Sequence, residues 1–266
     1  LELYLVPMAG AIWSMPKKDI MNYPVRSLFE FFNNHKLLHG KKDRPKWLTV
    51  SGGSINYVNK IINFLRANPR VKLLKNNGVK KIKRKNGFIE ITDNEGNTSE
   101  VDHIIFSQNP SKVVNILSDI QKNELDILGK FKANKNTAYL HSDESIMPKT
   151  KKIWSSWNIF VPKDEKSHIS VTYWMNKLQN INNKTPLFLS LNPVNLPNEG
   201  SIFKVIDYEH PIFDSKSITA LKFLDEIQGL NNTWYCGAWS GNGFHEDGLN
   251  SSLKVANKLG IKALWD

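Results

Sequence analysis

Glycines gather near the C-terminal end of the sequence, in a pattern that can bring backbone close to a ligand. Residues 234–249 read WYCGAWSGNGFHEDGL and are followed by a helical pattern. The apolar start predicts a buried strand, the glycines predict a loop, and the remainder predicts the N-terminus of a helix. Backbone N–H groups and a helix dipole at such a point can face a bound anion or an electron-rich ring. A plain strand–loop–helix with an ordinary helix cap explains the pattern equally well.

The residues of this loop have distinct expected roles. Its four glycines allow positive φ angles and the close approach of a ligand: Gly237, Gly241, Gly243 and Gly248. Asp247 is expected to cap the final helix. His245, Glu246 and Asp247 combine a general-base type with two carboxylates. Adjacent side chains do not face the same way, so no catalytic triad is predicted.

A second glycine pair precedes another predicted helix. Gly52 and Gly53 lead into Ser54, the expected N-cap, and are a candidate for backbone approach to a phosphate. Most turns of this kind are only turns. Val79, which follows Gly78, is ordinarily a core valine. No Gly-x-Gly-x-x-Gly fingerprint, the usual start of a dinucleotide site, occurs in the 266 residues.

Other catalytic and metal-binding patterns are missing from the sequence. The histidines outside the loop are scattered without metal-ligand spacing, so no metal site is predicted. No Gly-x-Ser-x-Gly elbow is present. Cys236 is the only cysteine, which excludes an internal disulfide. Its apolar surroundings predict a small core residue.

The chain is basic, with a formal net charge of +11. Its lysines cluster at 80–85 and 149–152 without a nucleic-acid-binding motif, so a solvated surface is favoured over a nucleic-acid site. Contact with an anionic membrane surface stays open. The opening segment 1–8 lacks the basic region of a signal peptide, and no apolar run reaches membrane-spanning length. We expect a chain that starts inside a larger protein and, with its single cysteine, a cytoplasmic location.

Local patterns predict the elements that must position these residues. Residues 3–13 are apolar and fit a strand or a buried helix end. Helical spacing predicts helices over 25–35, from 54 and from 111. Short β signals predict strands over 71–74, 79–83, 88–92 and 99–106, the middle two joined as a hairpin by the turn 85–87. A last strand is expected over 234–238.

The middle of the chain is rich in aromatic strand patterns. They lie at 137–141, 153–160, 169–174 and 187–191, with a further strand at 202–208. Antiparallel sheet is the natural arrangement for them. The aromatic residues Trp154, Trp157, Tyr173 and Trp174 fit either the wall of an apolar substrate pocket or an ordinary sheet core, and the core is favoured for each one. The pattern as a whole predicts an α/β chain with α+β features.

Several stretches, taken in order, resemble one protein family. They are RPKWLTVSGGSINYV at 44–58, LHSDESIMP at 140–148, WSSWN at 154–158, VTYWMNKLQ at 171–179, LNP at 191–193 and GFHEDGL at 243–249. Similar blocks occur in predicted NAD/FAD-binding, amine-oxidase-like flavoproteins of bacteria and in the N-terminal domain of plant cyclopropane fatty-acid synthases. Each block is modest alone, but the ordered set is specific and runs over essentially the whole chain.

The resemblance implies a monoamine-oxidase-like fold. In that fold a segmented, Rossmann-like FAD/NAD(P)-binding domain combines with an antiparallel-sheet substrate domain. Substrate-domain segments would lie at 1–44 and 119–225, and FAD-domain segments at 45–118 and 226–266. The family's first strand and its glycine fingerprint would precede Leu1, so the Rossmann-like domain would be incomplete. Binding of FAD by this chain alone would then be weak or absent.

The resemblance also implies how the chain would contact FAD as its cofactor. The Val79 backbone would meet the adenine. Gly52 and Gly53 would lie near the flavin, and Gly237 and Ala238 near the ribityl–pyrophosphate part.

The flavin ring itself would be covered at the start of the last helix, by Asp247, Gly248 and Leu249. Monoamine oxidases place a tyrosine of an aromatic cage just before the equivalent helix. Here the loop is longer and His245 falls near that place. Amine oxidation is therefore disfavoured, and His245 becomes the candidate catalytic group at the reactive face.

Taken together, the resemblance implies an FAD-dependent oxidoreductase that moves a hydride from an apolar or lipid-linked substrate to flavin. The similarity to cyclopropane fatty-acid synthases favours a lipid acyl chain as substrate and a fatty-acid-modifying enzyme as partner. The alternative is a non-catalytic flavoprotein-like module that partners a lipid-modifying methyltransferase at a membrane surface.

Overall fold

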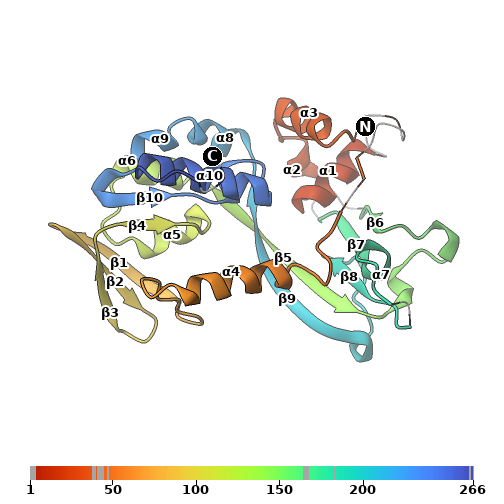
Figure 1. Ribbon diagram of the computed structural model, residues 1–266. Helices are drawn as coiled ribbons and strands as arrows, with labels where there is room; N and C mark the ends of the chain where they lie inside the picture. Colours follow the sequence, from red (N-terminus) through yellow and green to blue (C-terminus); the bar gives the residue numbers. More distant parts are fainter. Residues whose placement is uncertain are drawn as a thin grey trace. The chain divides into compact units, whose positions relative to one another are not determined.

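The computed structural model describes residues 4–37, 40, 45–46, 48–163, 168–182, 184–263 and 265 (Figure 1). Arg44 and Trp47 of the first family-like block lie outside these residues. The chain divides into two compact units. Unit 1 comprises Leu1–Met21, Val25–Asn76 and Lys135–Tyr208, and unit 2 comprises Asn22–Pro24, Asn77–Asn134 and Glu209–Asp266. These limits differ from the predicted segments, whose assignment to a cofactor or a substrate domain stays a prediction.

The helices of unit 1 come mostly from its N-terminal part. They are α1 (Leu5–Trp13), α2 (Lys17–Ile20), α3 (Val25–Asn34), α4 (Ile55–Ala67) and α7 (Met175–Leu178). The apolar stretch 3–13 therefore contains a helix rather than a strand. The predicted helix over 25–35 is confirmed: Phe31 on its apolar face is buried and meets the Trp13 ring edge-to-face, with 5.0 Å between ring centroids.

A five-stranded sheet has the order β6-β7-β8-β5-β9. Its strands are β5 (Lys132–His141), β6 (Trp157–Phe160), β7 (Ser170–Trp174), β8 (Phe188–Leu191) and β9 (Ile202–Ile212). The pairs β6–β7, β7–β8 and β5–β8 are antiparallel, as the sequence predicts. β6 begins at Trp157 rather than Ile153 because Lys151–Ile153 forms a 3-10 turn. Two strands have residues in both units: β5 passes from unit 2 into unit 1 after Asn134, and β9 passes from unit 1 into unit 2 after Tyr208.

Unit 2 contains a three-stranded antiparallel sheet of β1 (Val79–Lys85), β2 (Phe88–Asp93) and β3 (Thr98–Val101). The predicted hairpin is thus confirmed. Its two-residue loop is Asn86-Gly87, and Gly87 has φ +92°. Glycine takes the positive φ of this second loop position without steric cost, whereas Asn86 is not among the residues with positive φ.

A separate two-stranded parallel sheet pairs β4 (Ile104–Phe106) with β10 (Thr233–Tyr235). The predicted strand 99–106 is therefore two strands, separated by Asp102 and His103. The first, β3, belongs to the three-stranded sheet, and the second, β4, belongs to the two-stranded sheet. The unit's helices are α5 (Pro110–Ile116), α6 (Lys122–Leu128), α8 (Ser215–Leu221), α9 (Leu224–Ile227) and α10 (His245–Lys258). Further 3-10 turns of the chain span Glu144–Ile146, Glu199–Ser201, Leu230–Asn232 and Ala238–Ser240.

One core joins both sheets of unit 2 to its helices. Its buried members are Ile82, Ile89, Phe106, Val113, Leu117, Ile127, Leu128, Phe131, Ala220, Ile227, Tyr235 and Trp239. They come from the hairpin, both parallel strands, the four helices α5, α6, α8 and α9, and the segments next to them. The core thereby fixes the end of β10, where the glycine-rich loop begins.

The strand predicted over 71–74 is wrong. These residues form no strand, and Val71, Leu73 and Leu74 are exposed. A run of apolar residues becomes a strand only when a neighbouring strand accepts its hydrogen bonds and a core covers its side chains.

Candidate functional site

The candidate site lies at the carboxyl ends of the two parallel strands of unit 2. β4 leads through Ser107–Asn109 into α5, and β10 leads through the glycine-rich loop into α10. Parallel strands bring these ends to one edge of the sheet, which is where open α/β sheets bind ligands. The two loops touch, because a Cβ atom added to Gly237 would stand 3.1 Å from the Ser107 carbonyl oxygen.

Hydrogen bonds hold the glycine-rich loop in one conformation. The Gly237 N–H donates to Ser251 Oγ of α10 (2.8 Å), and the Ser251 hydroxyl donates to the Gly248 carbonyl (2.8 Å). The N–H groups of Gly241 and Gly243 both donate to the Ala238 carbonyl (3.1 Å each). The loop is therefore pinned to its own helix.

Gly237 must be glycine. Its φ is +133°, a region that side chains rarely adopt, and a Cβ would stand 2.7 Å from the Trp239 ring. Gly248 differs, since a Cβ there would stand 3.6 Å from the Ala238 nitrogen, an ordinary contact. Among the residues that the structure describes, no acceptor is found for the Ala238 N–H. Ala238 and Gly248 thus leave backbone accessible on the same side of the loop.

The last helix begins two residues earlier than Asp247, at His245. Asp247 does cap it, as expected, because its carboxylate accepts the Phe244 N–H at 3.0 Å. Gly248 lies in the first turn of α10, and its contact with a flavin ring stays a prediction. Its N–H already donates to the Phe244 carbonyl (3.2 Å) within the first turn.

The charges at this helix start favour one kind of ligand over another. Glu246 and Asp247 place two carboxylates in the first turn, where the helix dipole stabilises them. The same carboxylates repel a phosphate. The α10 end of the site therefore suits an uncharged polar ring better than a pyrophosphate.

Asn109 is a site residue that the sequence reasoning missed. Its Oδ1 accepts hydrogen bonds from the N–H and the hydroxyl of Ser111, both at 3.0 Å, and so caps α5. Its Nδ2 is buried and finds no acceptor in the described part of the chain. A buried donor without a partner costs free energy, which a bound acceptor would recover. The Asn-Pro pair before a helix was the available signal, but it indicates a cap rather than a site.

The other predicted site residues lie elsewhere. Gly52 and Gly53 have φ angles of +73° and +87° and belong to unit 1. Val79 begins β1 in the other sheet of unit 2 and is 40% exposed, so its interpretation as a core valine is wrong. His245 is exposed at the first position of α10, and Leu249 lies one turn further, also exposed. The roles in FAD binding or catalysis stay predictions for all these residues.

A buried ion-pair network contacts β10 through the Tyr235 side chain. Glu124 of α6 is completely buried and accepts both Arg84 Nη atoms, at 2.6 and 2.7 Å, and the Tyr235 hydroxyl at 2.8 Å. Arg84 Nε also donates to Asp119 at 2.8 Å. Burial alone raises the pKa of Glu124, but its hydrogen bonds and the Arg84 charge outweigh this and hold the pKa below its usual range. Burial and the Glu124 charge raise the pKa of Tyr235.

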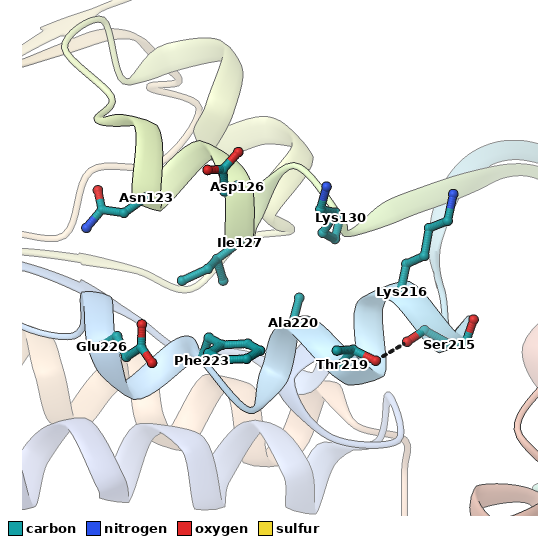
Figure 2. Close-up of a pocket in the computed structure, with 10 residues that line it drawn as sticks. All are labelled: Asn123, Asp126, Ile127, Lys130, Ser215, Lys216, Thr219, Ala220, Phe223 and Glu226. Carbon is teal, nitrogen blue, oxygen red and sulfur yellow. Dashed lines mark hydrogen bonds between the residues drawn. The ribbon is translucent and has the colours of Figure 1, made fainter.

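The largest pocket described is separate from the strand ends. It holds about 690 Å³ and lies between α6 on one side and α8 with α9 on the other (Figure 2). Ile127, Ala220 and Phe223 form its apolar part, while Lys130 and Lys216 stand at its rim (Figure 2). The helices that line the pocket contribute to the same core as β10. The pocket therefore lies beside this core and not at the edge where β4 and β10 end.

Within the described ranges, no three His, Cys, Asp or Glu side chains gather in a group that could hold a metal ion. No helix among these residues has the length and apolar character needed to cross a membrane.

No model of a known protein family matches the chain, and no curated protein does. Among solved structures, the chain resembles a CLA-producing fatty acid isomerase from P. acnes, with a TM-score of 0.51 and 14% identity over 76% of this chain and 52% of that one. It also resembles a proposed protoporphyrinogen oxidase from Exiguobacterium sp., with a TM-score of 0.61 and 12% identity over 88% of this chain and 58% of that one. A cyclohexylamine oxidase from Brevibacterium oxydans is more distant, with a TM-score of 0.45 and 9% identity over 68% and 48% of the chains.

Identities this low establish a shared fold and nothing finer. The chain spans about half the length of the solved structures it matches. The mixed α/β fold with antiparallel sheets is confirmed, whereas the Rossmann-like part and the link to cyclopropane fatty-acid synthases stay predictions. The chain thus shares its fold with part of the fatty acid isomerase and of the proposed protoporphyrinogen oxidase that it resembles.

Proposed function

We propose that this chain is part of an FAD-dependent oxidoreductase, which removes a hydride from a C–H bond of an apolar or lipid-linked substrate. The observation that carries the proposal is the edge where β4 and β10 end. There Asn109, whose buried Nδ2 finds no acceptor among the described residues, lies on one loop, and the other loop passes Ala238 close to Gly248. The fold shared with enzymes described as a fatty acid isomerase and a protoporphyrinogen oxidase agrees with it.

The residues present fit the ring end of FAD better than its phosphate end. Gly237 and Gly248 carry no side chain, so a flat group can approach the backbone. The Asn109 amide and the Ala238 N–H are donors for ring heteroatoms. The carboxylates of Glu246 and Asp247 disfavour a phosphate here, so the pyrophosphate would need donors from outside this loop.

Bound FAD would supply the hydride acceptor. The chain itself would orient the flavin ring and the substrate and would exclude water from the site. Glu246 and Asp247 offset the dipole at the N-terminus of α10, so this end would suit the uncharged form of the ring. His245, exposed at that point, would be the group placed to accept or hold a proton beside the substrate. A lipid acyl chain is the substrate class we favour.

The test compares Gly248→Leu with Gly248→Ala in a longer protein that contains this chain, because this chain alone is expected to bind FAD weakly or not at all. Both replace a glycine inside a helix, so neither should lower the melting temperature without cofactor. Only leucine fills the space beside Ala238. We expect added FAD to raise the melting temperature of the wild type and of Gly248→Ala, but not of Gly248→Leu. If yellow flavin never co-purifies and FAD shifts no melting temperature, the proposal is wrong.

The non-catalytic module is the second candidate, and one observation favours it. The N–H groups of all four loop glycines are already used within the protein. Such a loop could be a purely structural remnant, and the chain would then position a lipid-modifying methyltransferase at a membrane surface. Vesicle binding by wild type and by Gly248→Leu alike, in the absence of any response to FAD, would favour this candidate.

A further inference from the structure

Helix α4 leaves an apolar face uncovered. None of its residues is buried, and Phe64 is 69% exposed, Ile55 58% and Ile61 53%. At 100° per residue the apolar side chains fill one half of the helix surface: Ile55, Tyr57, Val58, Ile61, Ile62, Phe64 and Leu65. The other half carries asparagines, Lys60 and Arg66. The helix, drawn in orange in Figure 1, is therefore amphipathic, and Ile55, Ile61 and Phe64 of its apolar half are exposed.

The chain on either side of α4 also has exposed apolar side chains. Leu48 before the helix is 85% exposed, and Leu73 and Leu74 after it are also exposed. Exposed patches of this extent on a folded protein mark an interaction site. The stretch that was wrongly expected to be a strand, 71–74, belongs to this surface.

The charge of this segment identifies its partner. Between Asp43 and Glu90 the sequence has no acidic residue, although Asp and Glu together make up 25 of the 266 residues. The cations that follow or lie within the helix are all exposed: Lys60, Arg66, Arg70, Lys72 and Lys75. A second copy of α4 would offer these cations no acid within the segment. An anionic lipid surface offers both an apolar layer and the opposite charge.

We propose that α4, with Leu48–Val50 before it and Val71–Lys75 after it, is an interfacial element that binds anionic phospholipid. Its apolar half would enter the acyl boundary while its cations pair with headgroups. This goes beyond the proposed flavin chemistry and does not depend on it, because no residue at the ends of β4 and β10 is involved. It would bring the protein to the phase in which lipid-linked substrates reside.

The experiment is co-sedimentation of the full chain with vesicles of phosphatidylcholine containing phosphatidylserine, and with phosphatidylcholine alone. Wild type should bind only the anionic vesicles. Ile61→Ser/Phe64→Ser should abolish binding, and Lys60→Gln/Arg66→Gln should weaken it about 30-fold, at about fivefold for each lost cation. The matched control is Phe203→Ser/Val205→Ser on β9, which removes two apolar side chains that are 58% and 48% exposed and should bind like wild type.

All variants alter exposed side chains, so equal melting temperatures establish that they fold. Binding by Ile61→Ser/Phe64→Ser at the wild-type level would overturn the proposal, and so would equal binding of wild type to both kinds of vesicle. Light scattering tests whether a second copy of the chain covers the apolar face of α4 instead. A wild-type dimer that Ile61→Ser/Phe64→Ser converts to monomer would mean that a second copy covers the face, which also overturns the proposal. Failure of FAD binding leaves these results unaffected.

Discussion

Replacing Glu124 by glutamine removes the charge at the centre of the buried network while leaving its shape. In the wild type this carboxylate accepts two hydrogen bonds from Arg84, one from the Tyr235 hydroxyl and one from the Gln121 N–H. The glutamine amide can accept through only one oxygen, and its NH₂ group faces donors. Arg84 keeps its charge, with only 5% of its side chain exposed.

The magnitude follows from this burial. Removing one partner of a buried ion pair costs about 3–5 kcal/mol, because the other charge remains desolvated and unpaired. Asp119 still binds Arg84, so we expect the lower end, about 3 kcal/mol. For a chain of this size that lowers the melting temperature by about 6–10 °C. Because folding lowers the pKa of Glu124, its contribution is present above its ordinary pKa and is lost as pH falls through the lower folded value.

The assay is urea denaturation of wild type, Glu124→Gln and the control Lys85→Gln, which removes a partly exposed ion pair with Glu90 on the same hairpin. The control should change the midpoint little. The difference in the free energy of unfolding between wild type and Glu124→Gln should be largest at neutral pH and should become smaller in acid. A loss below 1 kcal/mol at neutral pH, or a difference that does not change in acid, would refute the reasoning.

Three further predictions come from the same unit and from the sheet of unit 1. Tyr235→Phe removes one hydrogen bond to the Glu124 carboxylate and should cost about 1.5–3 kcal/mol in urea denaturation, and no loss would mean that this bond is absent in solution. Gly237→Ala should cost at least about 2 kcal/mol because of its positive φ and the Trp239 contact, whereas Gly248→Ala should be neutral or stabilising by up to about 1 kcal/mol, and equal effects would contradict the loop geometry. His141 is buried, accepts the Asp143 N–H at Nδ1 and donates to Ser190, and burial lowers its pKa, so its stabilising contribution should be present above the ordinary histidine pKa of 6.5 and be lost as pH falls below it. Melting temperatures of wild type and His141→Gln at neutral and at mildly acidic pH check this, since the variant should lose less on acidification.

Features set by neighbouring residues could be predicted from the sequence. The Asn86-Gly87 hairpin, the amphipathic helix α3 and the alternation of the aromatic strands all depend on local preference and on which face is apolar. The loop after β10 was located for the same reason. Its conformation was not, because it depends on Ser107 and Ser251, which the sequence places far away.

Long-range partners explain the features that were missed. Arg84 stands in a run of lysines that predicts a solvated face, yet it is the buried member of that run. Its partners Asp119 and Glu124 lie 35 and 40 residues further along the chain. The run 71–74 shows the converse: it has a local preference for strand, but it pairs with no strand in the part of the chain that the structure describes. Asn109 was hidden in the same way, because an Asn-Pro pair reveals a cap but not a spare buried donor.

The pairing of β4 with β10 also has a consequence for the order of folding during synthesis. The Trp234 ring donates to His103 at 3.3 Å across a separation of 131 residues. Closing so long a loop costs about 2 kcal/mol more in chain entropy than closing one of about 10 residues. The strands β6, β7 and β8 leave the ribosome within that interval and can pair at once. The parallel sheet of unit 2 therefore cannot form, and β4 stays unpaired with β10, until β10 has been synthesised. A nascent chain stalled before β10 would be a target for chaperones and proteases even though its central sheet had already formed.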